Sequence, residues 1–289
     1  MPAKEFICLD GERIEIKDCL ERCRMDARCA TKPYLEMIGY DRGWKGISPS
    51  SAGTGVRCLY LKATTDYAIR PNDRAFAALG TAVHRKLSIH AYTRNVLSEE
   101  ALNGDQMKGI ADCLEMDENA PGEFCLTDYK TSGSYKVAQW LGIQKKIVPI
   151  LDDNGNAVLL KSGKNKGEPK TKSVFLTETP DLQDVALQLN SYRIFFEKAG
   201  FPISRMQIQA IVRDGGTFIA TSRGIDRSIY IIDVPKLPNS YVTEYYNKKI
   251  DELIQAFDYG YAKKCSDEEC WGGRRCEKWC EVKDECDKL

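Results

Sequence analysis

The sequence predicts a mixed α/β domain flanked by short cysteine-rich segments. Helix-like and strand-like patterns alternate through the middle of the 289 residues, in the order helix, strands, helix, strands, helix. Most of the 12 cysteines, by contrast, lie towards the two ends. We therefore expect an N-terminal cysteine module over residues 1–45, a core over 46–260 and a C-terminal cysteine module over 261–289.

Composition limits the class of protein. Hydrophobic residues make up 43% of the chain and charged residues 29%, which is typical of a chain that folds in water. No apolar run approaches the roughly 20 residues that span a bilayer, and the first residues form no signal peptide, so we expect a cytoplasmic protein. The 42 Lys and Arg balance 42 Asp and Glu, so a nucleic-acid site would have to be a local basic patch.

The terminal cysteines repeat one spacing. Gaps of ten, three and five residues separate Cys8, Cys19, Cys23 and Cys29, and the same gaps separate Cys265, Cys276, Cys280 and Cys286. In a reducing compartment such sets indicate metal ligands more than disulfides. A segment this short buries too little apolar surface to be stable alone, so a metal held by four thiolates would stabilise it. Zn²⁺ and a 4Fe-4S cluster both accept four thiolates, which leaves the metal open.

Residues 31–107 have a mainly helical pattern. Ser48-Pro49-Ser50-Ser51 is a signal for a helix start, and residues 74–97 form a long periodic stretch with one apolar face. That face comprises Phe76, Leu79, Val83, Leu87 and His90. Later helices are expected over 182–199, which is amphipathic, and over 241–257.

Strand-like runs predict two hairpins. The runs 108–116 and 123–131 flank a polar turn, and a second hairpin over 146–160 would turn at Asn154-Gly155. Further strands are expected at 206–213 and 227–234. Residues 161–172 hold five lysines among Gly, Asn and Pro, which predicts a flexible basic loop that would contact nucleic-acid phosphates without reading sequence. These lysines are Lys161, Lys164, Lys166, Lys170 and Lys172.

Acidic residues share one face of the first predicted hairpin. Alternation places Asp128 and Lys130 on one face of the second strand, and strand pairing can bring Asp112 of the first strand beside Asp128. Two adjacent carboxylates repel unless a cation lies between them, and oxygen ligands suit Mg²⁺ or Mn²⁺. Lys130 beside such an ion would orient a water or neutralise a phosphate oxygen. The pattern indicates metal-assisted phosphodiester hydrolysis.

These motifs resemble those of the PD-(D/E)XK nuclease superfamily, and within it the RecB-type exonucleases and the related CRISPR-adaptation nucleases. Four motifs occur in the family's order across residues 48–257: His84 in Gly80-Thr81-Ala82-Val83-His84, then Gly109-Ile110-Ala111-Asp112, Asp128-Tyr129-Lys130-Thr131 and Gln188-Leu189-Asn190-Ser191-Tyr192. The resemblance implies a restriction-endonuclease-like core, with a central mixed β-sheet flanked by helices. It implies metal ligation by His84, Asp112, Asp128 and the Tyr129 carbonyl, with Lys130 as the catalytic lysine. Gln188 and Tyr192, four apart and so on one helical face, would line the site.

The chain departs from this family in two ways. Between Lys130 and Gln188 lie 57 residues, more than the family usually needs, and the excess includes a basic insertion near 145–178. The family's iron-sulphur members take one cysteine before the core and three after it. Cys58, Cys276, Cys280 and Cys286 therefore form an alternative ligand set for a single 4Fe-4S cluster. We favour the two terminal modules because they account for eight cysteines at once.

The expected function is a metal-dependent DNA nuclease. The resemblance alone favours an exonuclease that acts on single strands or duplex ends, in DNA repair, recombination or the processing of phage DNA in defence. One alternative is a non-catalytic nucleic-acid-binding protein that uses its metal modules. Another is a CRISPR-adaptation nuclease with a single 4Fe-4S cluster. Cleavage polarity, the preference between DNA and RNA, and oligomeric state stay open.

Overall fold

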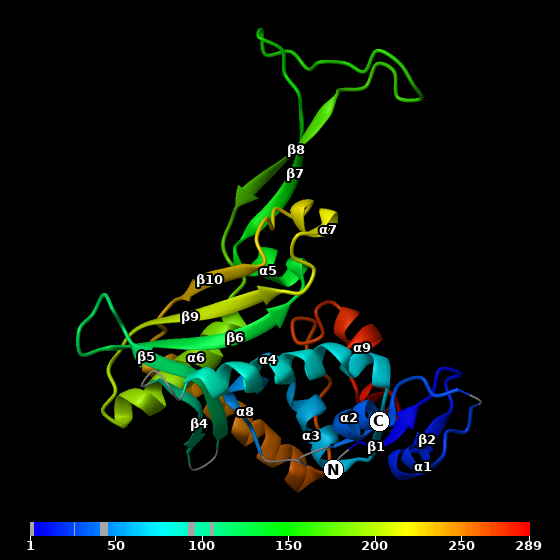
Figure 1. The fold of residues 1–289 in the computed structure, drawn as a ribbon, viewed down its shortest axis with the longest axis vertical. Helices are drawn as coiled ribbons and strands as arrows, with labels where there is room; N and C mark the ends of the chain where they lie inside the picture. The colour runs from blue at the N-terminus through cyan, green and yellow to red at the C-terminus, as the bar shows by residue number, and fades with distance from the viewer. Residues whose placement is uncertain (1–2, 26, 41–45, 92–95, 105–106) are drawn as a thin grey trace. The chain divides into compact units, whose positions relative to one another are not determined.

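The computed structural model describes residues 3–25, 27–40, 46–91, 96–104 and 107–289, which form helices and β-sheets (Figure 1). The predicted mixed α/β class is confirmed. By internal contacts the chain divides into unit 1 (Met1–Asp128, Asp184–Met206 and Pro235–Leu289) and unit 2 (Tyr129–Gln183 and Gln207–Val234). Both terminal segments and most of the expected core thus share unit 1. None of the helices in the described ranges has the length and apolar surface that a bilayer crossing requires.

The main sheet has five strands in the order β10-β9-β6-β5-β4. Its strands are β4 (Leu97–Asn103), β5 (Lys108–Met116), β6 (Phe124–Ser132), β9 (Ile203–Val212) and β10 (Ile229–Val234). Strands β6 and β9 each begin in unit 1 and end in unit 2. The sequence predicts β5, β6, β9 and β10 to within a few residues.

The hairpin of β5 and β6 forms as predicted. The two strands are antiparallel, and Cys113 lies opposite Thr127 and Met116 opposite Phe124. Inward-facing apolar residues fix this register, since Leu114 and Leu126 face each other and are at most 2% exposed. A slip of either strand by one residue would turn its leucine to the other face of the sheet.

A smaller sheet joins the start of the chain to its middle. It has the order β2-β1-β3, from β1 (Ala3–Ile7), β2 (Arg13–Glu15) and β3 (Tyr67–Ile69), and β1 runs parallel to β3. The expectation that residues 31–107 are mainly helical is therefore wrong at β3 and at β4. Strand β3 has only three residues, all buried, so it shows no alternation by which a sequence pattern could reveal it.

A hydrophobic core within unit 1 is built from distant parts of the chain. Phe6, Leu61, Leu253 and Val282 all belong to it, and each is at most 5% exposed. The surrounding helices are α1 (Ile16–Glu21), α2 (Lys32–Gly39), η1 (Pro49–Ser51), α3 (Val56–Thr64), η2 (Pro71–Arg74), α4 (Ala75–Ala91), α6 (Gln183–Lys198), α8 (Asn239–Tyr259), α9 (Arg274–Lys278) and α10 (Lys283–Asp287). Helix α6, expected to be amphipathic, is buried along most of its length.

Helix α4 differs from its prediction in length and in burial. The periodic stretch was expected to run to residue 97, but the helix ends at Ala91 and Leu97 begins β4; residues 92–95 lie outside the described ranges. None of the residues of α4 is buried, and Phe76 and Leu79 of its apolar face are 52% and 46% exposed. Periodicity predicts the apolar stripe, but tertiary packing decides whether anything covers it.

Unit 2 contains α5 (Ser134–Trp140), β7 (Ile143–Pro149), β8 (Thr171–Thr177) and α7 (Phe218–Thr221), besides its parts of the main sheet. The predicted hairpin over 146–160 is wrong in its pairing, because β7 pairs antiparallel with β8 from Ile143↔Thr177 to Pro149↔Thr171. The Asn154-Gly155 turn does form, with the Asp152 amide donating to the Asn156 carbonyl at 2.8 Å. It closes only the short bridge Leu151↔Ala157.

The basic loop is correspondingly shorter than predicted. Lys161, Lys164 and Lys166 lie between the turn and β8, whereas the Lys170 amide donates to the Val158 carbonyl at 2.7 Å and Lys172 belongs to β8 itself. All five lysines are exposed. The β7–β8 ladder forms more backbone hydrogen bonds than the local turn could. Lys170 and Lys172 therefore lie in hydrogen-bonded backbone and not in a loop.

Candidate metal centre and cysteine groups

Three neighbouring strands carry one row of acids. Ser98 and Glu100 of β4 lie opposite Cys113 and Ala111 of β5, so Glu99 stands opposite Asp112. Strands β5 and β6 pair through Cys113↔Thr127, and their register, continued by one residue, sets Asp112 opposite Asp128 of β6. Residues that face each other across antiparallel strands project from the same side of the sheet. The fold thus aligns Glu99, Asp112 and Asp128 across β4, β5 and β6.

The two central acids are buried. Asp112 is 7% exposed and Asp128 is 3% exposed, and their strand neighbours Ala111, Cys113 and Leu126 are buried as well. Burying a carboxylate is unfavourable unless hydrogen bonds or positive charge compensate for the lost hydration. The adjacent acids therefore require compensating partners in this part of the sheet.

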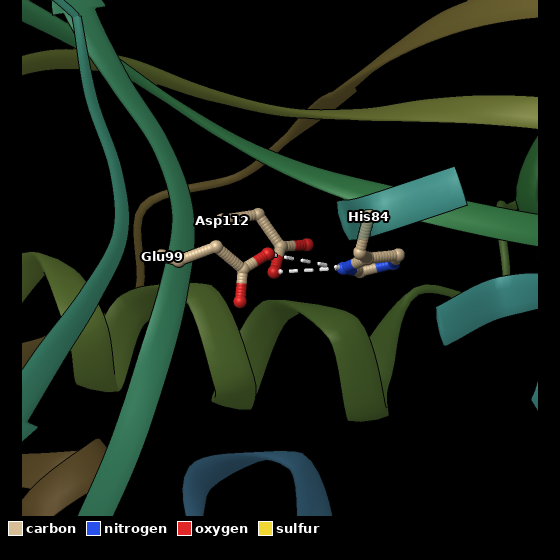
Figure 2. Close-up of side chains that lie close together, drawn as sticks. All are labelled: His84, Glu99 and Asp112. Atoms are coloured by element: carbon tan, nitrogen blue, oxygen red, sulfur yellow. Dashed lines mark hydrogen bonds and ion pairs between the residues drawn. The ribbon is translucent and has the colours of Figure 1, made fainter. Parts of the chain in front are cut away.

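His84 of α4 supplies one of these partners. Its Nδ1 lies 3.1 Å from Asp112 Oδ1 and 3.8 Å from Glu99 Oε1. Figure 2 shows both carboxylates directed towards the imidazole ring. The hydrogen bond to Asp112 raises the pKa of His84, against the opposing effect of burial, and the nearby charges of Asp128 and Glu99 act in the same direction.

Helix α6 supplies the amide that contacts Asp128. Gln188 Nε2 donates to Asp128 Oδ1 at 2.9 Å and to the Tyr192 hydroxyl at 3.4 Å. Burial raises the pKa of Tyr192, so its hydroxyl stays protonated at neutral pH. Gly109 permits the close approach of β5 to α6, since a Cβ there would lie 2.8 Å from Tyr192 Cε1. The two α6 residues expected at the site therefore lie beside Asp128.

Glu99 is the residue that sequence reasoning missed. No motif includes it, and the segment around it was expected to end a helix. Its backbone φ of 55° lies in the left-handed region, which is uncommon for a residue other than glycine and recurs at functional sites. A strand assignment for 97–103, with the register of β5, would have placed it opposite Asp112.

The arrangement fits a hard divalent cation. Ligand atoms of His84, Glu99 and Asp112 all lie within 4.8 Å of one another, and among the residues that the structure describes they are the one such group of three. The carboxylate oxygens suit Mg²⁺ and Mn²⁺, whereas the imidazole nitrogen is also a common ligand of Zn²⁺ and Fe²⁺.

Tyr129 and Lys130 follow Asp128 directly in β6 and are half-buried. They are the first residues of unit 2, whereas His84, Glu99, Asp112, Asp128, Gln188 and Tyr192 all belong to unit 1. Alternation along β6 gives Lys130 the same side of the strand as Asp128. The strand therefore carries the acid and the lysine of the predicted motif in sequence.

The chain matches no family model, and it matches no curated protein sequence. Its candidate site must therefore be judged by its own geometry and donor chemistry. Carboxylates, an imidazole and an amide gather where β4, β5, α4 and α6 meet, and this set is typical of an oxygen-rich metal site.

The C-terminal cysteines gather around Cys58 of α3. The Cys58 sulfur lies 3.7 Å from the sulfurs of both Cys265 and Cys280, and the Cys276 sulfur lies 3.5 Å from that of Cys270. Hydrogen bonds from Cys58 lower the pKa of Cys265 and of Cys280, and the same contacts raise the pKa of Cys58. A lowered pKa favours the thiolate, which is the form that binds metals.

Cys286, which both predicted ligand sets include, has a different neighbour. Arg57 Nε donates to its sulfur at 3.0 Å. Cys270 belongs to neither predicted set, yet it lies beside Cys276. Spacing along the chain could not choose among the last five cysteines, because all five lie within 22 residues of one another.

The N-terminal cysteines form a second group. Cys8, Cys19, Cys23 and Cys29 line one small pocket. These four cysteines are free thiols. Burial, and then the neighbouring Cys8, Cys23 and Cys29, raise the pKa of Cys19.

Proposed function

We propose that this protein is a metal-dependent nuclease, which hydrolyses DNA phosphodiester bonds on a restriction-endonuclease-like core of the PD-(D/E)XK type. The convergence of His84, Glu99 and Asp112 within 4.8 Å carries the proposal, because it builds an oxygen-rich cation site in line with Asp128. The lysine two residues after Asp128 supplies the positive charge that phosphodiester chemistry needs.

His84, Glu99, Asp112 and Asp128 would hold Mg²⁺ or Mn²⁺, with the Tyr129 carbonyl as a further ligand by resemblance to the family. When bound, such an ion polarises a phosphate oxygen and lowers the pKa of a water molecule. Gln188 fixes the Asp128 carboxylate through its 2.9 Å hydrogen bond, and Tyr192 lies on the other side of the same amide. The Lys130 ammonium neutralises charge that develops on the scissile phosphate, or orients the attacking water.

Single-stranded DNA or duplex ends are the proposed substrates, by resemblance to RecB-type exonucleases. The proposed setting is DNA repair, recombination or defence-related DNA processing in the cytoplasm. Lys161, Lys164, Lys166, Lys170 and Lys172 would contact phosphates, and binding through them would weaken as salt concentration rises.

The cysteine contacts favour one change to the sequence-based proposal. Cys58 lies upstream of the four nuclease motifs, and its sulfur contacts Cys265 and Cys280 downstream of them. This supports the alternative of a 4Fe-4S cluster with one ligand upstream and three downstream, in which Cys270 and Cys276 compete for the fourth position. A broad visible absorption band with about four iron atoms per chain would support this cluster, and a colourless zinc protein would contradict it.

A cleavage assay tests the nuclease proposal. Labelled single-stranded DNA is incubated with the protein and Mn²⁺, with and without EDTA. Asp112→Asn and Lys130→Met should each lower the cleavage rate by at least ~100-fold while the circular dichroism spectrum stays unchanged. Asp152→Asn and Lys198→Met make the same chemical changes at exposed positions and should leave the rate unaltered.

Two outcomes would contradict the proposal. One is full cleavage by Asp112→Asn or Lys130→Met. The other is a wild-type protein that binds Mn²⁺ and DNA yet leaves the DNA intact, which would favour the non-catalytic binding protein. The electron paramagnetic resonance signal of Mn²⁺ measures binding of the ion. Asp112→Asn should lose this binding, whereas Lys130→Met should keep it and lose only the cleavage chemistry.

A further inference from the structure

The N-terminal cysteines come together although the sequence spreads them over more than twenty residues. Cys8 follows β1, Cys19 lies in α1, and Cys23 and Cys29 lie between α1 and α2. All four line a pocket of about 20 Å³, together with Leu9, Met25, Ala27, Arg28 and Leu35. This group is unrelated to the acidic row, and the proposed nuclease chemistry makes no use of it.

Backbone hydrogen bonds hold the cysteines in this arrangement. The Cys8 amide donates to the Glu12 carbonyl at 2.8 Å, and the Gly11 amide donates back to the Cys8 carbonyl at 3.0 Å, which closes a tight turn after β1. Arg28 Nη1 donates to the Cys19 carbonyl at 2.7 Å and so ties the last cysteine loop to α1. Gly11 has a φ of +89°, a conformation that favours glycine at this turn.

The segment has little apolar surface to stabilise it. Of the described residues from 8 to 30, Cys19 alone is buried. Segments that bury so little are usually stabilised by disulfides or by a metal. Ile14, Ile16, Leu20 and Ala30 pack against the core of unit 1 but are only partly buried, and the four cysteines are free thiols that a metal can bind.

Charge and size both fit a small bound metal ion. Four thiolates around a divalent ion leave two negative charges, and two arginines lie at the group: Arg28 lines the pocket, and Arg24, which pairs with Asp10, reaches the Cys8 sulfur. A single water needs roughly 10–15 Å³, so a pocket of about 20 Å³ has room for one small ion.

We propose that Cys8, Cys19, Cys23 and Cys29 bind one Zn²⁺ ion in a tetrahedral structural site, separate from the cysteine group around Cys58. No three of the four sulfurs lie within 4.8 Å of one another, whereas Zn–S bonds of about 2.3 Å would hold them about 3.8 Å apart. Binding therefore draws the side chains inwards, and Cys29, which is exposed, has the freedom to rotate towards the others. The ion links β1, α1 and the loop that leads to α2.

Metal analysis of the full chain tests this site. Protein purified without oxygen from medium that contains both zinc and iron is analysed by mass spectrometry for each element. The double variant Cys19→Ser/Cys23→Ser should hold about one zinc fewer per chain than the wild type, with its iron content unchanged. Cys125→Ser changes a buried cysteine of β6, outside both groups, and should leave both metals unchanged. Cys58→Ser should leave this zinc in place.

Thiol labelling of the wild-type protein gives a second test that needs no variant to fold. Bound thiolates should resist alkylation, and a zinc chelator should make the four N-terminal cysteines reactive together. Equal zinc in the wild type and the double variant would overturn the proposal. Loss of iron in place of zinc in the double variant would also overturn it. A rate of Cys29 alkylation that is the same with and without the chelator would do so as well.

Discussion

Arg57 of α3 offers the sharpest test of how the C-terminal segment is held. Its side chain is 1% exposed although it carries a full charge. Nη1 donates to the Ala262 carbonyl at 2.6 Å, Nη2 to the Cys286 carbonyl at 3.1 Å, and Nε to the Cys286 sulfur at 3.0 Å. The guanidinium also lies 5.7 Å from the centre of the Tyr261 ring. One side chain thus joins α3 to two segments more than 200 residues further along the chain.

The effect of Arg57→Met follows from these contacts. Methionine fills much of the same volume but donates no hydrogen bond, so the buried Ala262 carbonyl and the partly buried Cys286 carbonyl lose their donor. Each such loss costs about 1–3 kcal/mol, and removal of one partner from a buried charged contact costs about 3–5 kcal/mol. The variant no longer buries a charge, which offsets part of this loss. We expect the free energy of unfolding to fall by about 4 kcal/mol.

Urea unfolding, followed by tryptophan fluorescence at matched metal content, measures this difference. Arg57→Lys keeps the charge but cannot reach three acceptors in a plane, so it should recover less than half of the loss. Arg227→Met is the control, because the side chain of Arg227 is 69% exposed, and it should change stability by less than about 1 kcal/mol. An Arg57→Met protein within about 1 kcal/mol of the wild type would refute the reasoning.

Two further predictions concern the turn at η1. Lys249 donates to the Ser51 carbonyl at 3.1 Å, and burial lowers its pKa from 10.5 to about 8. Between these values the unfolded chain binds a proton that the folded chain does not, so stability should rise with pH by up to about 3 kcal/mol. Lys249→Met should abolish this rise in urea titrations at about pH 7.5 and 10, and equal slopes for both proteins would contradict the assignment. Gly109→Ala would place a Cβ 2.8 Å from Tyr192 Cε1 and 2.9 Å from Pro49 Cδ, and it should cost about 1–3 kcal/mol in thermal unfolding. Gly133→Ala, whose nearest atom is 3.7 Å away, should cost little, and equal losses would show that these two close contacts are unimportant.

The predictable part of the site lies on strongly patterned strands. Asp112 and Asp128 could be paired from alternation alone, since the apolar residues around them fix both the faces and the register of β5 and β6. Gln188, which the family resemblance expects to line the site, donates a hydrogen bond to Asp128. Local pattern is informative here because each strand has nine residues, four of which are buried in succession.

The missed features depend on contacts between distant segments. Glu99 lies in a strand whose pattern is weak, because β4 is largely exposed, and only pairing with β5 defines its face. In the same way β7 pairs with β8 and not with the residues after the nearby Asn-Gly turn. The Cys58 contacts could not be read from spacing either, since 207 residues separate Cys58 from Cys265. Sequence periodicity carries no information about such partners.

The core of unit 1 has a consequence for how the protein is made. Phe6 and Leu61 pack in the same cluster as Leu253 and Val282, so this core lacks essential members until the ribosome has added residue 282. Both segments of unit 2 leave the ribosome before that point. During synthesis the apolar surface of the N-terminal half therefore stays exposed. Nascent chains in this condition aggregate or recruit chaperones. A stop codon that removes only Val282 and the residues after it should send most of the product into inclusion bodies.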